Sequence, residues 1–158
     1  MGGPFPLTFI QHSSNLHIHQ LTIVVYITQI ATSSWDKTVC LWSAKDGTPS
    51  HTLYGSLHQS WAATFSPDST LVTAGSGTGI IWIWNVATGE VVHRFKNDHE
   101  FNWVRSLAFT SNGRAITVGS AGGTLRLLDL ATGEVLQRWQ VDTSANCRAG
   151  SFNEVSNV

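Results

Sequence analysis

The chain has 158 residues and a net charge of −1 at neutral pH, without any basic run, so its composition favours neither a nucleic-acid partner nor an anionic membrane surface. Its charged fraction of 12% is about half the usual share, and its length suits one domain with a core rather than two. Its two cysteines, Cys40 and Cys147, lack CxxC or Cys/His spacing, which favours an intracellular, reducing compartment.

Residues 1–29 are expected to be an atypical N-terminal segment that is not repeat-like. The start "MGGPFPLTFI" has no Lys or Arg before its apolar part, so it is a poor secretory signal. Residues 21–31 are too few to cross a bilayer as a helix, but they can supply a strand. His17 and His19 alternate, which on a strand places both imidazoles on one face, as some metal sites require. Because no Cys, Asp or Glu lies near them in sequence, two ordinary surface histidines are the favoured interpretation.

The next part of the chain repeats with a period of 42 to 44 residues. We assign a partial unit to residues 30–55 and full units to residues 56–95 and 96–139. The phrase "NVATGEVVHRF", which ends the second unit, returns 44 residues later as "DLATGEVLQRW". Trp42, Trp84 and Leu128 occupy one column of this alignment. A self-match at this period is typical of an array of small structural units.

Each unit is expected to form four short antiparallel strands, with little helix. The runs "WAATF", "TLVTAG", "IIWIWN" and "EVVHRF" are rich in Val, Ile, Thr and aromatic residues, and turn sequences such as "SPDS" separate them. The third run is apolar on both faces, with Ile81 and Ile83 on one side and Trp82 and Trp84 on the other. Such a strand belongs in a sheet that lies between two others, and sheets stacked around an axis form a propeller.

Residues 140–158 are expected to be the start of a truncated further repeat, because "CRAGSF" at residues 147–152 aligns with "VRSLAF" at residues 104–109. Three units would leave an apolar sheet face uncovered at each end of the array. The chain is therefore interpreted as a fragment or variant of a longer protein. The alternative is self-association of two chains through the uncovered faces.

The period, the "FSPDS" turn, the "SSWDKTVCLW" run and the "ATGE" exit resemble WD40 repeats. The resemblance implies an all-β, incomplete WD40-type β-propeller with about three four-stranded antiparallel blades and a partial fourth. It implies a protein–protein interaction scaffold with no catalysis. It also implies a hydrogen-bonded network inside each blade, which we assign to Thr32, Asp36, Trp42, Trp84 and, one residue out of register, His99. Ala74 and Thr78 replace the hydroxyl and Asp of the second unit, so later blades should be held mainly by packing.

The resemblance places four residues on the narrow top face where partners of WD40 proteins dock: Trp35, Trp61, Trp103 and Arg105. Trp and Arg dominate interface hot spots elsewhere. The alternative is that these Trp side chains fill the space between blades. The exits "WSAK", "WNVA" and "LDLA" lack the W-D-x-R phrase by which some WD40 proteins hold ubiquitin-ligase adaptors, so that role is not expected.

Catalytic signatures are not found in the sequence. It contains no G-x-S-x-G elbow, HExxH or P-loop, and the Gly-rich "GSGTG" leads into a strand instead of a helix N-terminus. No cofactor and no metal site is expected. Two alternatives to a scaffold stay open: a truncated product without a function of its own, and a metal-dependent hydrolase that uses His17 and His19.

Overall fold

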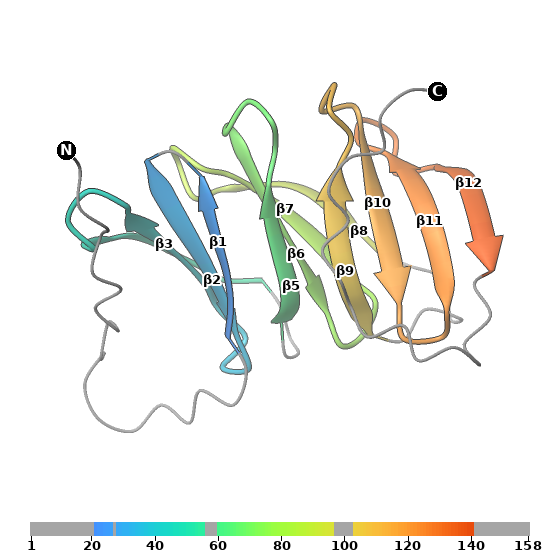
Figure 1. The fold of residues 1–158 in the computed structure, drawn as a ribbon, viewed down its shortest axis with the longest axis horizontal. Helices are drawn as coiled ribbons and strands as arrows, with labels where there is room; N and C mark the ends of the chain where they lie inside the picture. Colours follow the sequence, from blue (N-terminus) through green and yellow to red (C-terminus); the bar gives the residue numbers. More distant parts are fainter. Residues whose placement is uncertain (1–20, 27, 56–59, 97–102, 141–158) are drawn as a thin grey trace, which may run out of the picture.

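The computed structural model describes residues 21–26, 28–55, 60–96 and 103–140 (Figure 1). These residues form twelve strands in three four-stranded antiparallel sheets that follow one another along the chain. The first sheet contains β1 (Leu21–Tyr26), β2 (Gln29–Ser34), β3 (Val39–Ser43) and β4 (Pro49–Leu53). The second contains β5 (Ser60–Phe65), β6 (Leu71–Ser76), β7 (Ile81–Asn85) and β8 (Val91–Phe95). The third contains β9 (Val104–Phe109), β10 (Ala115–Ser120), β11 (Thr124–Asp129) and β12 (Val135–Gln140).

This architecture confirms the all-β fold expected from the sequence. In each sheet, every strand pairs with its neighbour in the chain, so each sheet is a meander of hairpins. The three sheets stack face to face in chain order, with the second between the first and the third (Figure 1). Among the described residues, no helix is long and apolar enough to span a membrane.

Strand β1 gives the first sheet its fourth strand, within the segment that the sequence marked as atypical. It pairs with β2 from Leu21 opposite Ser34 to Tyr26 opposite Gln29. This hairpin is therefore too short for a "SPDS"-type turn such as the one that joins β5 to β6. The missing turn signature explains why the alignment at a 42-residue period stops near residue 30.

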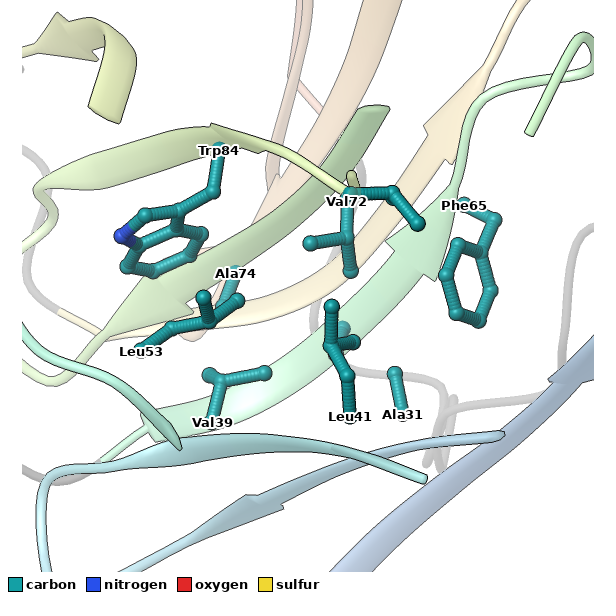
Figure 2. Close-up of a cluster of buried hydrophobic side chains, with 10 residues drawn as sticks. Ala31, Val39, Leu41, Leu53, Phe65, Val72, Ala74 and Trp84 are labelled. Atoms are coloured by element: carbon teal, nitrogen blue, oxygen red, sulfur yellow. The ribbon is translucent and has the colours of Figure 1, made fainter. Parts of the chain in front are cut away.

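The first core cluster lies between the first and second sheets, and Figure 2 shows side chains from both sheets pointing into it. Its ten buried members are Ala31, Val39, Leu41, Leu53, Ala63, Phe65, Val72, Ala74, Trp84 and Val86. The second core cluster lies between the second and third sheets. Its members are Ala62, Ile81, Ile83, Val104, Leu107, Ile116, Val118 and Leu128.

Strand β7 contributes to both clusters, as its two-sided apolar pattern predicts. Trp84 packs in the first cluster, whereas Ile81 and Ile83 pack in the second. Successive side chains of a strand point to opposite faces of its sheet, so the alternation of Trp and Ile fills the space on both sides. The second sheet is held by apolar burial on each face.

Two structural features require a glycine in the repeated "ATGE" phrase: a positive φ and close packing. Gly89 and Gly133 adopt φ values of 71° and 73°, a region that residues with a Cβ rarely enter. A Cβ on Gly133 would also lie 2.5 Å from Cδ1 of Phe95 in the preceding sheet, and one on Gly89 would lie 2.8 Å from Cδ2 of His51. Each turn therefore packs its glycine against the last strand of the sheet before it.

Six turns lie at one edge of the molecule, across from the edge that carries the candidate site described below, and we call it the opposite edge. The opposite edge comprises the β1–β2, β3–β4, β5–β6, β7–β8, β9–β10 and β11–β12 connections. Within each sheet, a backbone hydrogen bond joins the two turns at this edge. In the second sheet the amide of Val86 donates to the carbonyl of Thr70 at 2.9 Å, and Leu130 donates to Arg114 at 2.9 Å in the third. The carbonyl of Thr28 accepts the matching bond in the first sheet.

Asp68 organises the β5–β6 turn, and we expect it to make folding sensitive to acid. Its carboxylate accepts bonds from Ser66 Oγ at 2.6 Å and from the amide and hydroxyl of Thr70 at 3.1 and 2.9 Å. These bonds, that of Ser66 first, hold the pKa of Asp68 below its ordinary value. A lowered pKa in the folded state contributes stability above the ordinary pKa, and this stability is lost as pH falls through the folded value.

Asp68→Asn should therefore lower the melting temperature at pH 7, and the difference from the wild type should shrink as the pH is lowered from about 5 to about 3. Thermal unfolding followed by circular dichroism at several pH values measures this. A difference that is constant with pH would show that the turn does not depend on the carboxylate charge.

Candidate protein-docking edge

The edge of the molecule that lies across from those turns carries the candidate site, and we call it the candidate edge. It comprises the β2–β3, β6–β7 and β10–β11 turns and the starts of β5 and β9, which lie along one side of the stack (Figure 1). Ser60 pairs with Ser76, and Val104 pairs with Ser120, so both strand starts lie beside these turns. Trp35, Trp61, Trp103 and Arg105 all belong to this edge.

A β-bulge marks the start of both β5 and β9. The register of β5 shifts between Ser60 and Ala62, which leaves Trp61 as the extra residue. In β9, Val104 pairs with Ser120 and Ser106 pairs with Gly119, which leaves Arg105 as the extra residue. Bulges redirect a side chain and are common next to functional sites. The two bulged positions are 44 residues apart, which is the spacing of the repeat alignment. The alternation of apolar and polar residues along a strand does not reveal a bulge.

Trp103 and Arg105 form a pair at the start of β9. Trp103 is 44% exposed as a residue, and the guanidinium carbon of Arg105 lies 5.0 Å from the centroid of its ring. This distance is within the range of a cation–π contact. The backbone of Trp103 has a φ of 66°, and its carbonyl accepts a hydrogen bond of 3.1 Å from the amide of Ala121. The pair is thus fixed to the β10–β11 turn while its side chains face solvent.

Trp35 lies in the β2–β3 turn and is half-buried. The turn closes with a bond of 3.2 Å from the amide of Lys37 to the carbonyl of Ser34, and Lys37 has a φ of 75°. Asp36 Oδ1 accepts bonds from the amide and hydroxyl of Thr38 at 2.9 and 2.7 Å. The structure describes the backbone of Trp61, which belongs to β5, but not its side chain.

The proposed network residues are brought together only in part. Trp42 Nε1 donates to Thr32 Oγ1 at 2.9 Å across β2 and β3. Asp36 bonds to Thr38 in its own turn. His99 lies outside the described residues. Trp84 Nε1 donates instead to the backbone carbonyl of Tyr54, just after β4, at 3.3 Å. Ala74 occupies the position of Thr32 in the second sheet and has no hydroxyl to accept this bond.

The described residues contain no cluster of potential metal ligands. Within residues 21–26, 28–55, 60–96 and 103–140, no three His, Cys, Asp or Glu side chains gather in a way that would hold a metal ion. His17 and His19, the alternative hydrolase pair, lie outside the described residues. That alternative stays a prediction from the sequence.

Sequence models of two known families match the chain. The model of the "Anaphase-promoting complex subunit 4 WD40 domain" matches residues 63–150, which is more than half of the chain, and the model of "WD domain, G-beta repeat" matches residues 5–43. The chain belongs to the WD40 repeat family. Each described sheet is therefore one WD40 blade. The second match begins at residue 5, whereas the alignment of the repeats places the start of the first repeat at residue 30.

The chain spans less than a third of the length of each of three curated relatives that it matches. Human apoptotic protease-activating factor 1 is 36% identical over 93 residues, which are 55% of this chain and 8% of that protein. WD repeat-containing protein SL1-17 of Schistosoma mansoni is 34% identical over 86 residues, 54% of this chain and 28% of that protein. Subunit I of eukaryotic translation initiation factor 3 from Aspergillus terreus is 39% identical over 59 residues, 37% and 18% of the two chains.

Proposed function

We propose that this chain is a protein–protein interaction scaffold of the WD40 type, and that a protein partner docks on the candidate edge around Trp103 and Arg105. WD40 membership supports the general role of a protein-interaction scaffold. Two of the matched names are those of subunits, one of the anaphase-promoting complex and one of a translation initiation factor, which fits a module that works inside assemblies.

The observation that carries the proposal is the conformation of Trp103. A residue with a Cβ at a φ of 66° costs about 1–3 kcal/mol, and such strain persists where the surrounding structure enforces it, often at functional sites. Burial offsets only part of this strain, since 44% of the residue stays exposed. A structural role alone would favour Gly at this position. Aromatic and Arg side chains supply large, stiff contact areas in interfaces, so binding explains the retained strain.

The finer parts of the proposal are that the chain is part of a longer WD40 protein and that it acts inside the cell. The small share of each relative that is matched supports the first. The two cysteines without metal-ligand or CxxC spacing support the second.

Trp103→Gly separates a docking role from a structural one by the sign of its effects. Gly adopts a positive φ without strain, so the melting temperature should stay unchanged or rise, whereas partner binding should fall at least roughly tenfold, the effect of losing a hot-spot residue. Partners are first identified by affinity capture from extract of the source cells, and each is then purified and titrated against the variants.

Arg105→Ala should weaken the same binding, and Arg114→Ala serves as its matched control. Arg114 is exposed like Arg105 but lies at the opposite edge, so its loss should leave binding unchanged.

A drop in melting temperature for Trp103→Gly with unchanged partner affinity would show that the ring is a packing element, and would refute the proposed docking role.

A further inference from the structure

Four side-chain columns repeat through the three sheets with the same spacing of 42 and then 44 residues. Each column holds one residue per sheet, and its members occupy equivalent places in the strand pairing. The columns are Ala31, Thr73 and Thr117; Val39, Ile81 and Leu125; Leu41, Ile83 and Leu127; and Leu53, Phe95 and Trp139. In the first two sheets, these positions face the sheet that follows.

The following sheet covers the columns in the first and second sheets. Leu53 is only 2% exposed, and Ile81 and Ile83 are fully buried. In the third sheet, Ile116, Val118 and Leu128 point back into the second core cluster, so Leu125, Leu127 and Trp139 point the other way. We call this the outer face. Trp139 is 41% exposed. Figure 1 shows no described strand stacked on the third sheet on the side away from the second.

The first strand of each following sheet is the element that makes the close contact. Strand β5 packs on β1 and β2, and β9 packs on β5 and β6. Gly75 of β6 provides the space for β9, because a Cβ there would overlap the side chain of Val104. Gly119 is the equivalent residue of the third sheet, where it forms a gap beside Leu125 on the outer face.

From these contacts we infer that residues 147–152 of this chain bind to the outer face as an added strand, with Cys147 over Gly119. Cys147 aligns with Val104, and Phe152 aligns with Phe109 and Phe65. In Figure 2, Phe65 lies at the same end of the first core cluster as Ala31 and Leu41. The matching residues of the third sheet are Thr117 and Leu127, which Phe152 would cover.

The chain has the right length to make this connection. Seven positions separate Leu53 from the start of β5, and nine separate Phe95 from the start of β9. Eight positions separate Trp139 from Cys147. A segment of eight residues can span about 26 Å, enough to cross a four-stranded sheet whose strands are about 4.8 Å apart. The family match also continues to residue 150, beyond the end of β12.

Reactivity of the Cys147 thiol tests this assignment on the full chain. In a Cys40→Ser background, Cys147 is the sole thiol, and its alkylation by N-ethylmaleimide is followed by mass spectrometry under native conditions and in urea. Docking should slow the native reaction by roughly 100-fold relative to urea, because alkylation then requires local opening. The protection should be independent of protein concentration.

Gly119→Val should fill the gap and restore rapid alkylation of Cys147, while circular dichroism shows that the sheets stay folded. Gly122→Val is the matched control, because Gly122 is exposed in the neighbouring turn and should leave the protection intact. Gly119→Ala is a milder substitute if the Val variant unfolds.

Three results would overturn the assignment. Rapid alkylation in the native parent chain would show that the outer face is open to another protein. Protection that disappears on dilution would show that a second copy covers it. Protection that survives Gly119→Val would place Cys147 elsewhere.

Discussion

Trp84→Ala should lower the free energy of unfolding by about 3–5 kcal/mol, the usual cost of removing a large aromatic side chain from a core. Trp84 is 1% exposed and lies in the first core cluster beside Leu53 and Val72 (Figure 2). Its indole also donates to the carbonyl of Tyr54, just after β4, so the truncation also removes this hydrogen bond between the second sheet and the segment that follows the first. Urea unfolding of the purified chain measures the loss.

Trp42→Ala is the matched comparison, because Trp42 occupies the same column one repeat earlier. It is half-buried, and its indole bonds to Thr32 within its own sheet, so its removal should cost about 1–2 kcal/mol. Equal losses for Trp42 and Trp84 would contradict the account, since they would show that contact between sheets adds nothing to the stability of the second.

Gly75→Ala should destabilise the chain by about 1–3 kcal/mol, even though Ala usually stabilises strands relative to Gly. A Cβ at this position would lie 2.5 Å from the Cβ of Val104 and closer still to one of its methyl groups. The added carbon therefore forces the second and third sheets apart. The cost should appear in urea unfolding monitored by tryptophan fluorescence.

Gly119→Ala supplies the control for this prediction. Gly119 is the residue of the third sheet that corresponds to Gly75, and its nearest described neighbours would lie 3.4 Å from an added Cβ. A clash with the docked Cys147 would release only residues 147–152 and would not separate two sheets, so the substitution should cost less than Gly75→Ala. A Gly75→Ala variant as stable as the wild type would show that the second and third sheets do not approach as closely as the Gly75–Val104 contact requires.

Much of the fold follows from the sequence because burial on two faces leaves a clear signal. The alternation of Ile and Trp in β7 identifies a sheet covered on both sides, and its residues do separate into the two core clusters. The repeated "ATGE" phrase fixes the turns, because its Gly must combine a positive φ with close packing against the preceding sheet.

The features that escaped prediction depend on spacing between distant residues. Strand β1 pairs with β2 through a hairpin too short for the familiar turn sequence, so the first sheet is complete although its first strand lacks the motif. The bulges at Trp61 and Arg105 arise from pairing register, which one strand's sequence does not reveal. The strain at Trp103 likewise has no local signature, since Gly would be the expected residue at a positive φ.

Hydrogen–deuterium exchange of the chain with and without its captured partner tests the central claim most directly. We expect slowed exchange at the candidate edge: residues 34–38 of the β2–β3 turn, residues 103–106 at the bulged start of β9, and residues 120–123 of the β10–β11 turn. The turns of the opposite edge, residues 66–70 and 110–114, should exchange at the same rate in both samples. Slowed exchange confined to those opposite turns, with no change around Trp103 and Arg105, would contradict the proposed docking edge.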